Sequence, residues 1–457
     1  MQKIAAYICL GIISIFAVII IDMSDLILSL LYCALALFSI KLIWDKSEHK
    51  ITLFMVFVLS YNVFIGGRFL VYPFSQRHDI FVLTFFSDYV AKGGERISIF
   101  LYVYLLLFMS TIGYYVGWDK KRKVRFVPKQ TINTANNINK VLLWVFPVLA
   151  VVTLYNSLVG LTEAWIHGYA AMGIDESASN NISYVRKFAN MAVSIFAGMS
   201  IAYGNTKSRK YYLGLLLLTS IFSILGGSRG ALGAVLMFAL WAYSRYRKLN
   251  IKKLFLYSIG GLTIMLFLFS VSVRAVTYGY SDMSMRDAFE DFFYSNGGSL
   301  MIFGVSMTVS NYPVLPYFQT FITGANVLYS LLWGVTVSPE TLSFQGHLCN
   351  TLNSSLFYSG AGLGWTVNGD LFLFSGRNIF VYSILAYLLG RFLSYIDVCS
   401  FKSSFYLFVA GSLCFGIAMM PRGSLSALFA MIPYIYMFYF LVIFLGKVKG
   451  SKSVYLK

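Results

Sequence analysis

The sequence predicts an all-α, polytopic integral membrane protein. Hydrophobic types make up 58% of its 457 residues and charged types only 12%, whereas an ordinary soluble domain carries about 25% charged residues. The mean hydropathy is +0.72. A soluble chain of this length could not bury so many apolar side chains in one core. These observations exclude soluble enzymes, nucleic-acid-binding modules and disordered scaffolds.

Twelve segments of the chain are candidates for membrane-spanning helices, which need roughly 20 mostly apolar residues. The first one has the charge order of a signal peptide. It lacks a small-residue cleavage site and runs straight into the next apolar stretch, so we expect a membrane helix there. The twelve expected spans are 4–21, 25–44, 51–67, 97–117, 141–159, 187–204, 211–227, 230–244, 254–273, 378–394, 403–420 and 424–445.

The positions of lysine and arginine orient these spans, since basic residues concentrate on the cytoplasmic side. Segment 118–140 contains seven basic residues and is predicted to be a cytoplasmic loop. If the expected helices alternate in direction from this loop, the segments on the cytoplasmic side carry a net charge of +21 and those on the outer side −3. Together these give the net charge of +18. Both termini are then cytoplasmic, and residues 1–457 form a single membrane domain with a large periplasmic loop at 274–377. The basic excess is therefore a topology signal, and no nucleic-acid partner is expected.

Within the large loop, the sequence from Ser284 predicts an amphipathic helix. Ser284 and Asp287 have the spacing of a capping box, with Asp in place of the usual Glu. Aromatic and aliphatic side chains recur on one face and charged side chains on the other. Two placements stay open for this helix: flat on the outer leaflet, or packed on the other external segments.

Arginines at the outer helix ends are the main chemical signal, because the positive-inside rule selects against them there. In GGSRG (226–230) and MPRGS (420–424), almost no loop separates two helices, and glycine frees backbone amides for an anion. Arginine also binds phosphate oxygens bidentately. A converging set would bind an anion at the outer membrane boundary, whereas single arginines can instead reach lipid head groups. The five are Arg186, Arg229, Arg274, Arg377 and Arg422.

Three further side chains are candidates for substrate chemistry. Asp370 lies in a glycine-rich run just before an expected helix, where a carboxylate can act as a general base or hold an arginine. Glu163, beside aromatic residues, fits a sugar contact or a membrane-interface belt. His347 can serve as an acid, a base or a phosphate donor, or be purely structural. The spacing of His, Cys and acidic residues gives no metal site, and no cofactor is expected.

These motifs together resemble the Wzy-type O-antigen and oligosaccharide repeat-unit polymerases. The likeness covers roughly residues 140–445, and the N-terminal third matches in topology only. Asp370 matches an acidic position of the family, although the aromatic and Asn residues that follow it there are altered here. The features that carry the resemblance are the basic loop near 120–130, GGSRGAL ending one helix, the large late external loop, GDLFLFSG entering the next helix, and MPRGS joining the last helix pair.

The resemblance implies a metal-independent membrane glycosyltransferase with a GT-C-like helix arrangement in the bacterial inner membrane. Its active site would face the periplasm and take oligosaccharides linked to undecaprenyl pyrophosphate. The growing chain would pass to a new lipid-linked unit, with release of undecaprenyl pyrophosphate. Asp370, Arg229 and Arg422 would be catalytic, and Arg186, Arg274, Arg377, Glu163 and His347 would bind substrate. A chain-length regulator is a possible partner.

Two other functions stay open at this stage. An O-antigen ligase, which transfers the chain to lipid A core, resembles the polymerases in fold and also uses external Arg and a loop His. A lipid-linked oligosaccharide flippase or other transporter would place charges around a central cavity. Here most ionisable residues lie at helix ends, which favours a polymerase over a transporter.

Overall fold

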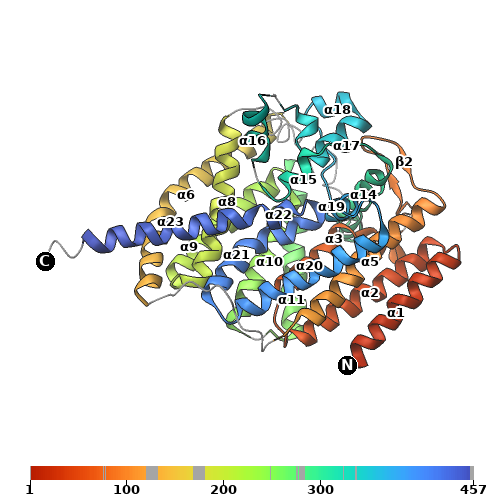
Figure 1. Ribbon diagram of the computed structural model, residues 1–457, viewed down its shortest axis with the longest axis horizontal. Helices are drawn as coiled ribbons and strands as arrows, with labels where there is room; N and C mark the ends of the chain where they lie inside the picture. Colours follow the sequence, from red (N-terminus) through yellow and green to blue (C-terminus); the bar gives the residue numbers. More distant parts are fainter. Residues whose placement is uncertain are drawn as a thin grey trace. The chain divides into compact units, whose positions relative to one another are not determined.

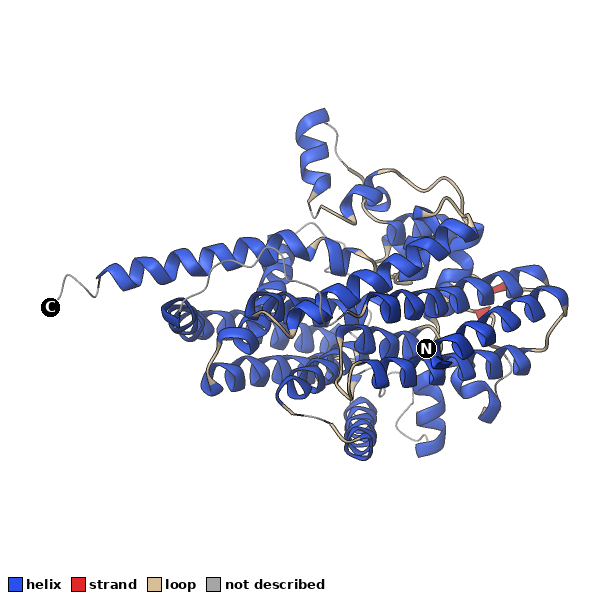
Figure 2. Cartoon of the chain, turned by 60° about the horizontal axis from the view of Figure 1, so that its bottom comes forward, coloured by secondary structure: helices blue, strands red, loops and turns tan. Residues whose placement is uncertain are grey.

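The computed structural model describes residues 2–75, 77, 79–119, 132–167, 181–247, 249–273, 276, 284–322, 324–334 and 337–452. Within these ranges the regular structure is helical except for one short sheet (Figure 2). Strands β1 (Val82–Leu83) and β2 (Tyr89–Val90) pair antiparallel, with Val82 opposite Val90. The chain divides into two compact units: residues 1–119, 283–395 and 417–429 form the first, and 120–282, 396–416 and 430–457 the second.

The first unit combines the N-terminal helices with most of the predicted outer segment and the C-terminal turn. Its elements, labelled in Figure 1, are α1 (Gln2–Ile20), α2 (Asp25–Lys46), α3 (Leu53–Phe64), α4 (Gly67–Val71), η1 (Tyr72–Phe74), α5 (Gly94–Gly117), α13 (Met285–Asn296), α14 (Ser299–Thr308), α15 (Leu315–Gln319), α16 (Ala325–Trp333), η3 (Pro339–Thr341), α17 (Phe344–Leu352), α18 (Ser354–Tyr358), α19 (Val367–Phe374), most of α20 (Ile379–Ser400), η4 (Met420–Arg422) and α22 (Ser426–Phe429).

The second unit is built from long apolar helices. They are α6 (Ile132–His167), α8 (Asn181–Tyr203), α9 (Thr206–Leu225), α10 (Arg229–Tyr246), α11 (Ile251–Ser270), most of α21 (Ser404–Met419) and α23 (Met431–Lys452).

The all-α class is confirmed, and each of the twelve expected spans overlaps a helix. Among the described residues, seven helices are long and apolar enough to cross a membrane. An eighth span results if α3 and α4, which are bent by 69° at Ile65–Gly66, are counted together. The count of twelve spans and the GT-C-like arrangement therefore stay predictions.

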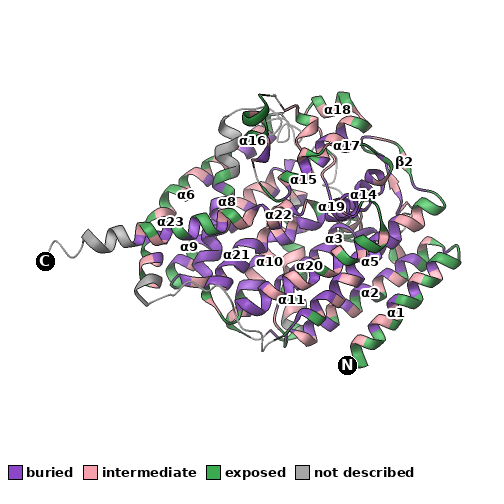
Figure 3. Ribbon diagram, viewed as in Figure 1, coloured by how far each residue is buried: buried purple, intermediate pink, exposed green. Residues whose placement is uncertain are grey.

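Burial follows what a membrane environment requires. Most of α5 is buried, whereas α1 and α6 keep many exposed apolar side chains (Figure 3). Several buried hydroxyl groups have partners inside the protein: Tyr7 and Ser39 share a hydrogen bond of 2.8 Å, and Tyr61 donates to the Val103 carbonyl at 3.0 Å. In a bilayer there is no water to replace such partners, so these internal hydrogen bonds stabilise the fold.

Helix α6 is longer than expected at both ends. The sequence predicts a span at 141–159, but the helix runs from Ile132 to His167, and α8 begins at Asn181 rather than at 187. The polar stretch before residue 141 contains no proline or glycine to stop a helix, so helical structure continues into it. Most of the basic loop at 118–140, residues 120–131, lies outside the described residues.

The predicted amphipathic helix is present as α13. Ser284 is its N-cap: the hydroxyl accepts from the Asp287 N–H at 3.2 Å and donates to Asp287 Oδ2 at 2.7 Å. α13 packs against α4 and α3 within the first unit. Of the two placements that the sequence left open, packing on other segments is therefore observed.

Candidate functional site

Asp370 lies on the short helix α19, which directly precedes the expected helix, α20. Thr366 caps α19 by accepting a hydrogen bond from the Gly369 N–H, which places Asp370 in the first turn. The side chain is fully buried. A general base has to reach its substrate, so this burial bears directly on the role that the sequence predicted for Asp370.

Three donors hold the Asp370 carboxylate. Trp365 Nε1 donates to Oδ1 at 2.7 Å, Ser424 Oγ donates to Oδ2 at 2.8 Å, and the Leu425 N–H donates to Oδ2 at 2.5 Å. Burial raises the pKa of Asp370 to about 6, while the three donors act in the opposite direction. The carboxylate thus ties α19 to the turn at 424–425.

Arg422 ends η4, two residues before Ser424. It is exposed, and its guanidinium lies 5.9 Å from the centre of the Phe64 ring at the end of α3. The hydrogen bonds from Ser424 and Leu425 to Asp370 therefore fix the backbone directly after Arg422. An arginine held on such a turn is preorganised to bind an anion.

Arg377 has a left-handed backbone, with φ of 66°. Such a conformation costs an ordinary residue about 1–2 kcal/mol and favours glycine. The arginine side chain has specific contacts: Nη2 donates to the Val309 carbonyl at 2.5 Å, and the guanidinium lies 5.6 Å from the Phe372 ring centre. Arg377, the arginine nearest to Asp370 in the sequence among the predicted site residues, therefore contacts Val309 and not the carboxylate.

His347 lies on α17 and is half-buried. Its Nε2 is 3.5 Å from the Ser310 carbonyl oxygen, and its ring centre is 5.0 Å from that of Tyr312. Glu340 lies near enough to His347 to interact with it electrostatically. Hydrogen bonds from its own backbone and from Ser338 and Tyr358, together with His347, hold the pKa of Glu340 below its usual range.

The segment 309–312 joins these side chains into one cluster. Its first two carbonyls contact Arg377 and His347, and the Tyr312 ring centre lies 5.9 Å from that of Trp365. Trp365 in turn donates to Asp370. Three of the eight predicted residues, Asp370, Arg377 and His347, therefore belong to one connected group of contacts in the first unit, and Arg422 adjoins it through the backbone that leads to Ser424. We call this group the 309–312 cluster.

The other four predicted residues belong to the second unit. Arg274 and the side chains of Arg186 and Arg229 lie outside what the structure describes. The backbone at Arg229 begins α10 three residues after α9 ends, as the GGSRG motif predicts. Glu163 is half-buried on α6.

In the part of the chain that the structure describes, no three His, Cys, Asp or Glu side chains are placed to hold a metal ion. The polar groups of the 309–312 cluster are instead arginine, imidazole and carboxylate side chains with aromatic neighbours. Arginine and imidazole can stabilise negative charge and transfer protons.

The family model for the O-antigen polysaccharide polymerase Wzy matches residues 4–452 of the chain. The chain belongs to this family. Searches of curated proteins and of solved structures gave no match. Wzy polymerases act on lipid-linked oligosaccharide repeat units in a membrane and serve lipopolysaccharide biosynthesis. The resemblance seen in the sequence is therefore confirmed, and it extends through the N-terminal third.

Three residues of this Wzy-family cluster were missed by sequence reasoning: Tyr312, Trp365 and Ser424. Ser424 stands inside the MPRGS motif, so its position next to Arg422 was a usable signal. Trp365 precedes Asp370 by five residues, but no local pattern shows that its indole N–H points at the carboxylate. Tyr312 follows Asn311, whose φ of 59° bends the segment.

Proposed function

We propose that this Wzy-family chain polymerises oligosaccharide repeat units linked to undecaprenyl pyrophosphate at the periplasmic face of the inner membrane. The match of residues 4–452 to the polymerase family is the observation that carries this proposal. The growing chain is transferred from its carrier to a hydroxyl group of a new lipid-linked unit, and undecaprenyl pyrophosphate is released.

The reaction makes three physical demands. The acceptor hydroxyl oxygen forms a bond to the anomeric carbon, and the bond between that carbon and the pyrophosphate oxygen breaks. The bonding electrons leave with the pyrophosphate, and the hydroxyl proton passes to a base. The protein must therefore stabilise an anion, accept a proton and hold two sugar chains.

Arg422 is our assignment for stabilising the leaving pyrophosphate. It is exposed, and its turn is held by the buried Asp370, so the guanidinium needs little reorganisation when charge develops. Arg377 supports the same cluster from the Val309 side. Arg186, Arg229 and Arg274 remain candidates for additional phosphate contacts. With arginines in this role, the reaction needs no metal ion.

His347 is our assignment for the proton acceptor, in place of Asp370. A base must reach the hydroxyl to within hydrogen-bonding distance. Asp370 is fully buried and both of its oxygens are occupied, whereas the imidazole is half-exposed and lies near Glu340, which can stabilise an imidazolium. Asp370 then acts as a positioning residue for the turn that carries Arg422. Glu163 stays a candidate sugar contact.

The test is polymerisation by purified protein with two acceptors in parallel. With lipid-linked repeat units alone, we expect a ladder of products that differ by one unit. With lipid A core added, we expect no transfer to it. Transfer to lipid A core without a ladder would make the chain a ligase and contradict the proposal.

The role of His347 is tested by His347→Gln, with His49→Gln as the matched control between α2 and α3. We expect loss of about a hundredfold or more in the first variant, the lower range of base catalysis, and no loss in the second. Equal activity of the two variants would exclude His347 as the base.

A further inference from the structure

An apolar groove runs between α4–η1 and α13 within the first unit. Its volume is about 280 Å³. Apart from two charged side chains it is lined by aliphatic and aromatic groups, and none of the polymerase assignments above uses it. The lining residues are Leu70, Val71, Phe74, Arg286, Phe289, Glu290 and Phe293.

The two walls of the groove are held together closely. A Cβ atom at Gly67 would overlap with the Phe293 carbonyl oxygen, so glycine is what lets α4 approach α13. The buried Arg68 side chain donates to the Ile80 and Val82 carbonyls at 2.8 and 2.6 Å and lies 4.4 Å from the ring centre of Tyr294 on α13. The groove is therefore a preorganised feature and not a gap between loose segments.

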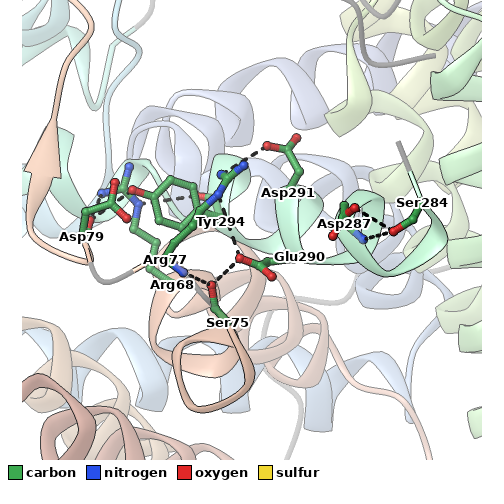
Figure 4. A network of polar contacts seen from close by, with 9 residues as sticks. All are labelled: Arg68, Ser75, Arg77, Asp79, Ser284, Asp287, Glu290, Asp291 and Tyr294. Atoms are coloured by element: carbon green, nitrogen blue, oxygen red, sulfur yellow. Dashed lines mark hydrogen bonds and ion pairs between the residues drawn. The ribbon is translucent and has the colours of Figure 1, made fainter. Parts of the chain in front are cut away.

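The charge of Glu290 at the groove is already compensated. Ser75 donates to its carboxylate, and Arg77 lies 3.9 Å from it while also pairing with Asp291 at 3.4 Å (Figure 4). Arg286, one turn earlier on α13, is exposed and has no hydrogen bond or ion pair with any described residue. Among the described residues, the groove therefore presents one positive charge without an ion-pair partner beside an apolar channel.

Helix α4 belongs to a bent apolar segment, and aromatic side chains at the groove are exposed. Helices α3 and α4 qualify as a membrane span only when they are taken together as one bent segment. Phe74 and Phe289, at the groove, have exposed fractions of 78% and 46%. Exposed aromatic side chains of this kind are available to contact an apolar ligand.

From these observations we propose that the groove binds the polyprenyl chain of the lipid carrier next to its pyrophosphate, with Arg286 contacting a phosphate oxygen. This inference rests on the proposed function, which supplies the carrier as substrate. At ~30 Å³ per water, the volume corresponds to roughly nine waters. That room holds a short segment of one hydrocarbon chain.

The groove and the aromatic neighbour of Arg422 lie on the two halves of one bent segment. Phe64, which contacts the Arg422 guanidinium, is the last residue of α3, and Leu70 begins the groove six residues later. A carrier held in the groove would lie along α4. The bend at Ile65–Gly66 would then stand between the carrier chain and the turn that carries Arg422. Arg286 would act in binding, while Arg422 would act on the leaving group.

The experiment measures binding of undecaprenyl pyrophosphate to the full chain in phosphatidylcholine nanodiscs by native mass spectrometry. Arg286→Gln should weaken binding about tenfold or more, because a charge-assisted hydrogen bond to phosphate is lost. Leu70→Trp, which fills the groove, should weaken it similarly. Lys92→Gln is the control: this lysine is exposed on the same unit, outside the groove.

Equal affinities of the Arg286 and Lys92 variants would overturn the proposal. So would displacement of the carrier by an equal amount of phosphatidylglycerol, which would make the groove a site for bulk anionic lipid. Polymerisation by the wild-type protein is measured in parallel. A normal product ladder with an unaffected Arg286 variant refutes only the groove, whereas no ladder from the wild type refutes the proposed function.

Discussion

Replacing Asp370 by Asn separates a positioning role from a chemical one. An amide has only one oxygen, whereas the carboxylate accepts obligate donors on both sides, Trp365 Nε1–H and the Leu425 N–H. In either orientation the amide NH₂ faces another N–H group. Each buried polar group left without a partner costs about 1–3 kcal/mol, so Asp370→Asn should destabilise the turn at 424–425 by about 2 kcal/mol or more.

Adding Trp365→Phe removes one of the two clashing donors. The Asn oxygen can then face Leu425 and Ser424, and the NH₂ group faces the phenyl ring. In a double-mutant cycle, two residues in contact typically have an interaction energy of about 0.5–3 kcal/mol. The double variant should therefore unfold at a higher temperature than Asp370→Asn alone, by a fluorescence-detected melt of the purified protein.

The activity assay is chain growth per folded protein, with Trp365→Phe alone as the control. If Asp370 positions the Arg422 turn, the double variant should stay within about tenfold of this control. If Asp370 is the base, replacing it should cost about a hundredfold or more whatever its neighbour. A double variant that is as stable as the control but remains a hundredfold less active would refute the positioning role.

Three other predictions follow from the same cluster. Arg422→Lys should lower activity about tenfold without lowering protein level, because lysine lacks the bidentate fork; full activity would reduce Arg422 to a lipid anchor. Excess EDTA should leave polymerisation by the purified protein unchanged, and a loss that added magnesium restores would show a missed metal site. Burial raises the pKa of Asp370 in the folded protein to about 6, above its ordinary value. The contribution of the Asp370 side chain to the stability of the fold should therefore be fully present below about pH 4 and be lost as the pH rises to about 6. A melting temperature that rises between these two pH values, relative to that of the double variant, would contradict this prediction.

The class of fold was predictable because hydropathy is a local property of the chain. The boundaries of α6 were less so, since the polar residues before position 141 neither favour nor break a helix. The N-cap of α13 was also predictable, because a capping box needs only two residues three positions apart. In the same way, GGSRG and MPRGS predicted where α9 and α21 end.

The arrangement of the site was harder to predict, since its contacts join residues far apart in the chain. Asp370 bonds to Ser424, 54 residues later, and Arg377 to Val309, 68 residues earlier. A glycine-flanked aspartate suggests an accessible base, and nothing in the local sequence shows that α19 buries it. The resemblance to Wzy polymerases predicted a role for Asp370, whereas the structure is needed to suggest what that role is.

The direction of chain growth tests the central claim most directly, because it asks which molecule is the acceptor. Purified protein would first extend unlabelled lipid-linked units and then receive units labelled with a heavy isotope. If the growing chain moves onto each new unit, mass spectrometry of the products should find the label next to the lipid. Label at the end farthest from the lipid would show that new units are added to the growing chain, and would contradict the account.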